Sequence, residues 1–104
     1  MNNGEGGPTG PHPLPLGRVV ATPGAIDLLD RLGGPRSKLT IATLIRRHSN
    51  GDWGDLCDED RQVNVDALAN GERIMSVYTV HDARLYVITE ADRSATTFLL
   101  PSEY

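Results

Sequence analysis

The chain has 104 residues, 14 of them acidic and 10 basic, and a formal net charge of -4. This length predicts one domain with a single modest core, and the acidic balance excludes a generic nucleic-acid-binding protein, whose surface carries a basic surplus. A single cysteine excludes an internal disulfide, and no apolar run is long enough to cross a bilayer. With no secretory leader pattern either, we expect a cytoplasmic protein that makes no direct contact with membrane or nucleic acid.

The first part of the chain is rich in Gly, Pro and Asn and has almost no apolar residue before Leu14. Such a segment buries too little surface to offset the entropy of ordering it. We therefore predict a disordered tail over residues 1–16 and one compact domain over residues 17–104. The β-favouring run at 17–21 either adds an edge strand to a sheet or leads directly into the first helix.

Two helices are predicted next. Thr22 and Pro23 start the first one, because a threonine hydroxyl caps free amides and proline at the first helical position loses no hydrogen bond. This helix covers residues 23–32, and the Gly-Gly-Pro sequence that follows ends it. The second covers residues 37–48, where apolar residues recur at helical spacing. Its β-branched residues leave a strand over 39–45 as the alternative.

The rest of the chain predicts a third helix and a meander. The helix covers residues 58–70, with Val63, Ala67 and Leu68 directed inward. After it, β-favouring runs alternate with polar turns, which is typical of antiparallel strands. The strands are expected over residues 73–80, 84–90 and 95–101. We therefore predict an α+β fold in which about three helices pack on a three- to four-stranded antiparallel sheet.

An acidic stretch surrounds the only tryptophan, Trp53. Its five carboxylates belong to Asp52, Asp55, Asp58, Glu59 and Asp60. One interpretation is a surface that imitates phosphate; the other is an acid-rich helix start, which the positive end of the helix dipole favours. The order of these acids does not fit an EF-hand, and no metal site is predicted.

The polar junction between the last two strands contains Arg93. In one interpretation, Arg93 clamps an anion and Asp92 or Glu90 acts as a base. In the other, Asp92 and Ser94 satisfy the loop backbone and Arg93 pairs with a nearby carboxylate. A further hypothesis joins Arg93 to His48 in a metal-independent ribonuclease site, where the histidine moves protons and the arginine stabilises the phosphorane.

Several common site motifs are absent from the sequence. It contains no GxGxxG, GxxxxGK[ST], HExxH or GxSxG pattern, so dinucleotide-binding, P-loop, zincin and α/β-hydrolase chemistry have no support. Cys57 has no Cys or His partner at zinc spacing and is expected to be a partly buried structural thiol. No cofactor is predicted.

Four blocks of the sequence carry a family resemblance: GRVVATPGA, RRHSNGDWGDLCDEDRQVN, RIMSVY and ITEADRSATTFLLPSEY. With them the chain from residue 17 onward resembles short proteins of bacterial plasmids and integrated conjugative elements, labelled "plasmid-related protein" or "type I restriction endonuclease subunit M". A methyltransferase subunit needs a glycine-rich cofactor loop and an NPPY-like motif, and this chain has neither. Relatives usually carry an acid at the position of Cys57, so a catalytic role for this cysteine is not expected.

The resemblance implies a mobile-element accessory protein in a bacterial cytoplasm. Our first hypothesis is a non-enzymatic anti-restriction or anti-CRISPR inhibitor that binds a defence nucleoprotein complex through the acidic residues around Trp53, with Arg93 as a further binding residue. One alternative is a small barnase-like or RelE-like ribonuclease, or a relic of one, that uses His48 and Arg93. The other is a structural or regulatory module that self-associates through a sheet edge. An enzyme is the less favoured class, and the oligomeric state is left open.

Overall fold

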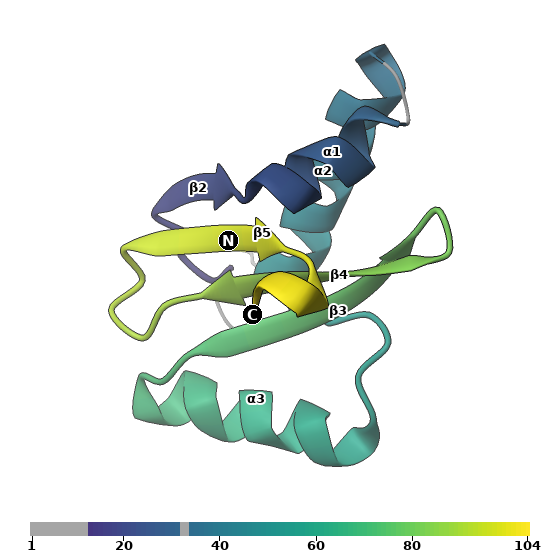
Figure 1. The fold of residues 1–104 in the computed structure, drawn as a ribbon. Helices are drawn as coiled ribbons and strands as arrows, with labels where there is room; N and C mark the ends of the chain where they lie inside the picture. The colour runs from purple at the N-terminus through teal and green to yellow at the C-terminus, as the bar shows by residue number, and fades with distance from the viewer. Residues whose placement is uncertain (1–12, 32–33) are drawn as a thin grey trace, which may run out of the picture.

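Three helices and four strands form in the described part of the chain, residues 13–31 and 34–104 of this computed structural model (Figure 1). The helices are α1 (Pro23–Asp30), α2 (Gly34–Ser49) and α3 (Asp58–Asn70). The strands are β2 (Arg18–Ala21), β3 (Ile74–Val80), β4 (Ala83–Thr89) and β5 (Ala95–Leu99). A short 3-10 helix, η2 (Pro101–Glu103), follows β5. The predicted α+β class is confirmed.

The sheet has the strand order β2-β5-β4-β3. The meander β3-β4-β5 is antiparallel as predicted, but β2 pairs with β5 in parallel, so the sheet is mixed and the expectation of a purely antiparallel sheet is wrong. The run at 17–21 therefore adds an edge strand, the first of the two alternatives. Three helices separate it from the meander, which is the long connection that a parallel pairing requires.

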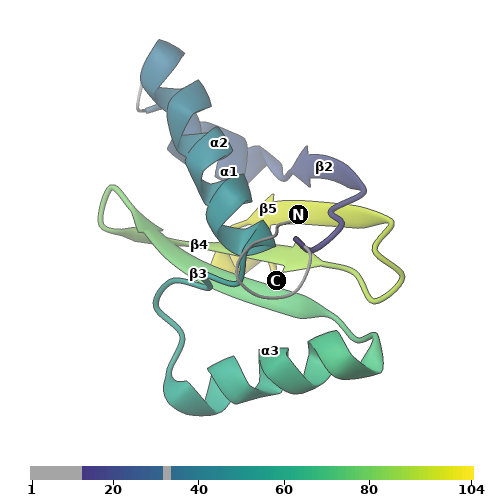
Figure 2. The same ribbon diagram turned by 180° about the vertical axis from the view of Figure 1, so that it is seen from behind.

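Helices α1 and α2 cover one face of the sheet, and the other face is crossed by η2 (Figures 1 and 2). The core between helices and sheet contains Leu28, Leu29, Leu44, Tyr78, Leu85, Val87 and Phe98. Helix α2 starts three residues earlier than predicted because Gly34 and Pro35 form its first turn, where proline costs no hydrogen bond. The alternative strand over 39–45 is wrong.

Helix α3 lies along the outer edge of β3 rather than over a face (Figure 1). Its buried residues are Asn64 and Ala67, whereas Val63 and Leu68, both expected inward, are 60% and 42% exposed. The Asn64 side chain donates to the Met75 carbonyl at 2.7 Å and accepts from the Met75 amide at 3.2 Å. The helix therefore docks on the backbone of an edge strand, and an amide side chain serves that contact better than an apolar stripe.

The packed region begins before residue 17. Leu14 is buried, and its amide donates to the Ser49 carbonyl at 2.9 Å, while the Ser49 hydroxyl donates to the Leu14 carbonyl at 3.0 Å. The predicted tail over 1–16 is therefore too long by at least its last three residues, and residues 1–12 lie outside the described part of the chain. Leu14 and Leu16 join Trp53, Ala67 and Ile74 in a second small core.

Candidate functional site

The acidic stretch of the sequence forms a loop that is fixed to the edge of β3. The Val77 amide donates to the Trp53 carbonyl at 3.1 Å, and the Asp55 amide donates to the Val77 carbonyl at 2.7 Å. Gly54 thus forms a parallel bridge with Val77. Its φ of 76° suits glycine, and a side chain at this position would overlap the Val77 carbonyl.

Side chains from two elements hold the same loop. From α3, the Arg61 guanidinium donates to the Gly54 carbonyl at 2.6 Å and to the Leu56 carbonyl at 3.2 Å. From β3, the Tyr78 hydroxyl donates to the Asp52 carbonyl at 2.7 Å. The carbonyls of Asp52, Gly54 and Leu56 are therefore bound by side chains of the protein, which favours one conformation of the loop.

Asp52 is tied to α2 as well. The Arg47 guanidinium donates to both of its carboxylate oxygens, at 2.7 and 3.1 Å, and lies 4.7 Å from the centre of the Tyr78 ring. The Arg47 hydrogen bond lowers the pKa of the Asp52 carboxyl, and the same bond raises the pKa of Arg47. Asp52 therefore stays ionised well below neutral pH.

The carboxylates of this region lie at the surface. We call them the acidic rim: Asp52, Asp55, Asp58, Glu59 and Asp60, all exposed. Three of them form the first turn of α3, where the helix dipole favours negative charge, as the helix-start interpretation predicts. Asp55 accepts a hydrogen bond from the Thr79 hydroxyl at 2.8 Å. Within the described residues, Asp52 is the one rim member in an ion pair.

Two residues near the rim differ from expectation. Trp53, predicted as an aromatic anchor for a partner, is only 7% exposed and packs against Leu14, Ala67 and Ile74. Its role is to hold the loop, so we remove it from the candidate binding surface. Cys57, expected to be partly buried, is exposed just before the first turn of α3.

His48 lies in a buried polar network that the sequence analysis missed. Its Nδ1 lies 2.6 Å from the Ser76 hydroxyl and its Nε2 lies 2.8 Å from the Thr89 hydroxyl. Thr89 is in turn 2.7 Å from the Thr96 hydroxyl, which donates to the Leu16 carbonyl at 2.8 Å. The side chains of His48, Ser76, Thr89 and Thr96 are all 1% exposed or less.

The last acceptor sets the direction of every proton in this network. A carbonyl only accepts, so Thr96 donates to Leu16 and must accept from Thr89. Thr89 then accepts from Nε2–H of His48. Burial lowers the pKa of His48 to about 4, so at neutral pH its Nδ1 carries no proton and accepts from the Ser76 hydroxyl. Both ring nitrogens are therefore occupied by the protein.

The network gives the protein a pH-dependent stability. Burial lowers the pKa of His48 from 6.5 to about 4. Between these two values the unfolded chain binds a proton that the folded chain does not, so the stabilisation is complete above pH 6.5 and is lost as the pH falls towards 4. We expect a loss of about 2–3 kcal/mol in the free energy of unfolding over this range, measured by urea titration. His48→Leu should lack this slope, and an equal slope in the variant would contradict the assignment.

Arg93 holds the junction between β4 and β5 together. Its guanidinium donates to the Glu72 carbonyl at 2.6 Å and to the Glu90 carbonyl at 3.1 Å, and its φ is 62°. The Ser94 amide donates to the Asp92 carboxylate at 3.0 Å, as the turn interpretation predicts. That interpretation is wrong on one point, since within residues 13–31 and 34–104 Arg93 pairs with main-chain carbonyls and with no carboxylate.

The ribonuclease hypothesis requires His48 and Arg93 to face a common substrate. The His48 side chain is buried between the last turn of α2 and the sheet, and no hydrogen bond joins it to Arg93 among the described residues. One guanidinium nitrogen of Arg93, Nη1, already donates to two loop carbonyls. The structure therefore does not bring these two candidate residues into an exposed pair.

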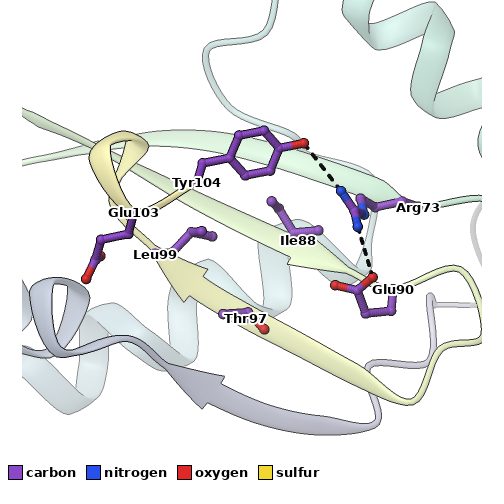
Figure 3. A pocket seen from close by; sticks show the side chains of 7 residues that line it. All are labelled: Arg73, Ile88, Glu90, Thr97, Leu99, Glu103 and Tyr104. Atoms are coloured by element: carbon purple, nitrogen blue, oxygen red, sulfur yellow. Dashed lines mark hydrogen bonds and ion pairs between the residues drawn. The ribbon is translucent and has the colours of Figure 1, made fainter.

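A shallow depression of about 360 Å³ lies on the open face of the sheet (Figure 3). Apolar side chains of Ile88 and Leu99 form its floor, beside Thr97. Arg73 lies at the border of the depression, and its guanidinium is 3.3 Å from the Glu90 carboxylate and 3.3 Å from the Tyr104 hydroxyl. Arg73 and Glu90 thus pair with each other rather than facing the depression as free charges.

The remaining carboxylate of the depression, Glu103, connects η2 to the start of α1. It accepts from the Thr22 hydroxyl at 2.5 Å, the Leu100 amide at 2.8 Å and the Gly24 amide at 3.0 Å. The Thr22 bond, and then the Leu100 bond, hold the pKa of the Glu103 carboxyl below its ordinary value. Glu103 is thus a structural clamp at the sheet edge.

No protein-family model, curated protein or solved structure matches the chain. Over residues 13–31 and 34–104, no cluster of three His, Cys, Asp or Glu side chains is arranged to hold a metal ion. The same residues contain no helix long and apolar enough to cross a membrane.

Proposed function

We propose that the protein is a non-enzymatic binding protein that presents the acidic rim to a basic groove on a protein partner. The observation that carries this proposal is the rigid loop beneath the rim, which β3, α3 and Tyr78 hold through backbone carbonyls and amides. A surface that is already ordered loses little conformational entropy on binding. The backbone that carries the loop carboxylates is already held in place for contact with arginine and lysine side chains.

The net charge and the exposed carboxylates also support a binding surface at the acidic rim. The chain carries a formal net charge of -4, and the exposed acids Asp55, Asp58, Glu59 and Asp60 form no ion pair within the described residues. A rigid group of negative charges steers a basic partner into contact and imitates the phosphates of a nucleic acid. His48 and Arg93, the residues that the ribonuclease hypothesis requires, make hydrogen bonds within the fold.

The resemblance to mobile-element proteins supplies the class of partner. In this proposal the partner is a restriction or CRISPR nucleoprotein complex with a basic groove for nucleic acid. The protein occupies that groove stoichiometrically and without turnover. Salt weakens the contact because the attraction acts between exposed charges.

The test compares two double variants with the same change in net charge. Asp55→Lys with Asp58→Lys reverses two charges of the rim, whereas Asp27→Lys with Asp30→Lys reverses two exposed charges of α1. Wild-type protein with an affinity tag is used to capture the partner from the native bacterial host, and the affinity of the purified partner is then measured for all three proteins.

The proposal expects the rim variant to bind at least about tenfold more weakly than wild type, and the α1 variant to bind within about twofold of it. The α1 variant loses the exposed Asp27–Arg31 pair, which contributes little to stability. Equal weakening by both variants would show a nonspecific charge effect and reject the rim as the binding surface. Unchanged binding by the rim variant would reject it directly.

A further inference from the structure

The two edges of the sheet differ in whether other parts of the chain bind their backbone groups. At the β3 edge, Asn64 pairs with both backbone groups of Met75, and the loop at Gly54 pairs with both backbone groups of Val77. These contacts close the β3 edge to strand addition from outside. Thr79, at the end of the same edge, is bound through its side chain by Asp55.

The β2 edge has no such cover in the described part of the chain. The Arg18 amide donates to the Ser94 carbonyl and the Thr22 amide to the Phe98 carbonyl, each at 3.0 Å. Since hydrogen-bonding direction alternates along a strand, Val19 and Ala21 direct their amides and carbonyls away from β5. In both views of the ribbon, no described helix or strand runs along this outer side (Figures 1 and 2).

Side chains on β2 do little to block pairing. Val19 and Val20 are 41% and 39% exposed, and β-branched residues are good strand formers. Neither proline nor lysine interrupts the strand, and its one charged residue, Arg18, lies at its first position. Natural proteins usually protect an open edge with such residues, with a bulge or with a covering segment.

We propose that two copies of the chain pair through the outer edges of β2, antiparallel and about a two-fold axis at Val20. Val19 of each copy then faces Ala21 of the other, and each such pair exchanges two hydrogen bonds, so four bonds join the copies. The two Val20 side chains meet at the axis, where opposed residues come closest. The result is one continuous sheet of eight strands.

The register follows from where the strand starts. Gly17 has a φ of 64°, so extended backbone begins at Arg18, and the outward-directed residues within β2 are Val19 and Ala21. The axis at Val20 uses both of them in both copies. It also places Arg18 opposite Thr22 of the second copy, so no like charges face each other. A two-fold interface of this kind is self-complementary and closed.

A strand of four residues gives a small interface. Stable dimers bury about 1,200–2,000 Å², and we expect this one to bury less. Association is therefore expected to be weak, with monomers prevailing below about 10 µM and dimers becoming substantial towards about 1 mM. This concentration range sets the design of the experiment.

The test is sedimentation equilibrium of the full chain across that range, together with amide hydrogen exchange followed by NMR. Val19→Pro removes one outward amide and keeps the bonds to β5, and Val20→Lys places two like charges at the axis. The control is Val65→Lys, the same chemical change at an exposed position of α3. Thermal unfolding monitors the fold of every variant.

The wild-type mass should rise with concentration, and the Val19 and Ala21 amides should exchange more slowly as it does. The Arg18 and Val20 amides, which face β5, should show no such dependence. Val19→Pro and Val20→Lys should each weaken dimerisation at least about tenfold, and Val65→Lys should leave it unchanged. A monomer throughout, or a dimer that both β2 variants retain, would overturn the proposal.

Discussion

Replacing His48 by alanine is expected to lower the free energy of unfolding by about 3–5 kcal/mol. The change opens a cavity in a region where the ring is 1% exposed, and it leaves the hydroxyls of Ser76 and Thr89 without their partner. Without the His48 ring, the directions of the hydrogen bonds from Thr89 to Thr96 and on to the Leu16 carbonyl are no longer fixed. Urea unfolding followed by circular dichroism measures the loss.

The matched control is Arg46→Ala, an exposed position on the same helix. It should change the free energy of unfolding by no more than about 0.5 kcal/mol. If His48→Ala were as stable as this control, His48 would not be the structural centre that the network implies. A surface histidine kept for catalysis would behave in that way.

The second large effect is expected at Gly54. Gly54→Ala should cost about 3–4 kcal/mol, because alanine pays a penalty at a φ of 76° and its Cβ would overlap the Val77 carbonyl. The loop must then move away from β3. Slow exchange of the Val77 and Asp55 amides, which the bridge protects, should be lost with it.

Gly71→Ala separates the two causes of this effect. Gly71 has a similar φ of 69°, but among the described residues no atom beyond Gly71 and its two chain neighbours lies within 4 Å of the position that a Cβ would take. It should therefore cost only the conformational penalty, about 1–2 kcal/mol. Equal losses at the two glycines would mean that the close approach of the loop to β3 does not matter for stability.

His48 and Gly54 hold two consecutive segments of the chain. The His48 network fixes the end of α2 against the sheet, and the Gly54 bridge fixes the loop that follows it. Together they position the acidic rim without using any rim carboxylate as a buried group. The rim is thus available to a partner while the backbone beneath it stays in place.

The helices and the meander could be predicted because their signals are local. Thr22 and Pro23 mark a helix start that the structure confirms, with the Thr22 hydroxyl accepting from the Ala25 amide at 3.2 Å. Alternating β-favouring residues placed the three meander strands to within about two residues, the usual uncertainty of element ends. Such features depend on neighbours in sequence, which are visible in the chain.

The pairing of β2 and the docking of α3 depend on distant residues and could not be read in the same way. Four residues at 18–21 do not reveal whether they join β5 or another strand. Helix α3 was expected to bury Val63 and Leu68, but it uses Asn64 to bind the backbone of β3. An asparagine in a helix offers no periodic pattern that would indicate this contact.

The candidate site was predicted only in part. The rim carboxylates are exposed as expected, whereas Trp53 is buried beneath them. The network of His48 had a signal in the sequence, namely the inward strand positions that carry hydroxyls, Ser76, Thr89 and Thr96. Three hydroxyls on an otherwise apolar face require a polar partner, and a histidine at the end of α2 is that partner.

The salt dependence of binding tests the central claim most directly. With the purified partner, the affinities of wild type, the rim double variant and the α1 double variant are measured from low to high salt. If the acidic rim occupies a basic groove, affinity falls steeply with salt for wild type and for the α1 variant, and clearly less steeply once Asp55 and Asp58 are lysines. Identical salt dependence for all three proteins would contradict the account.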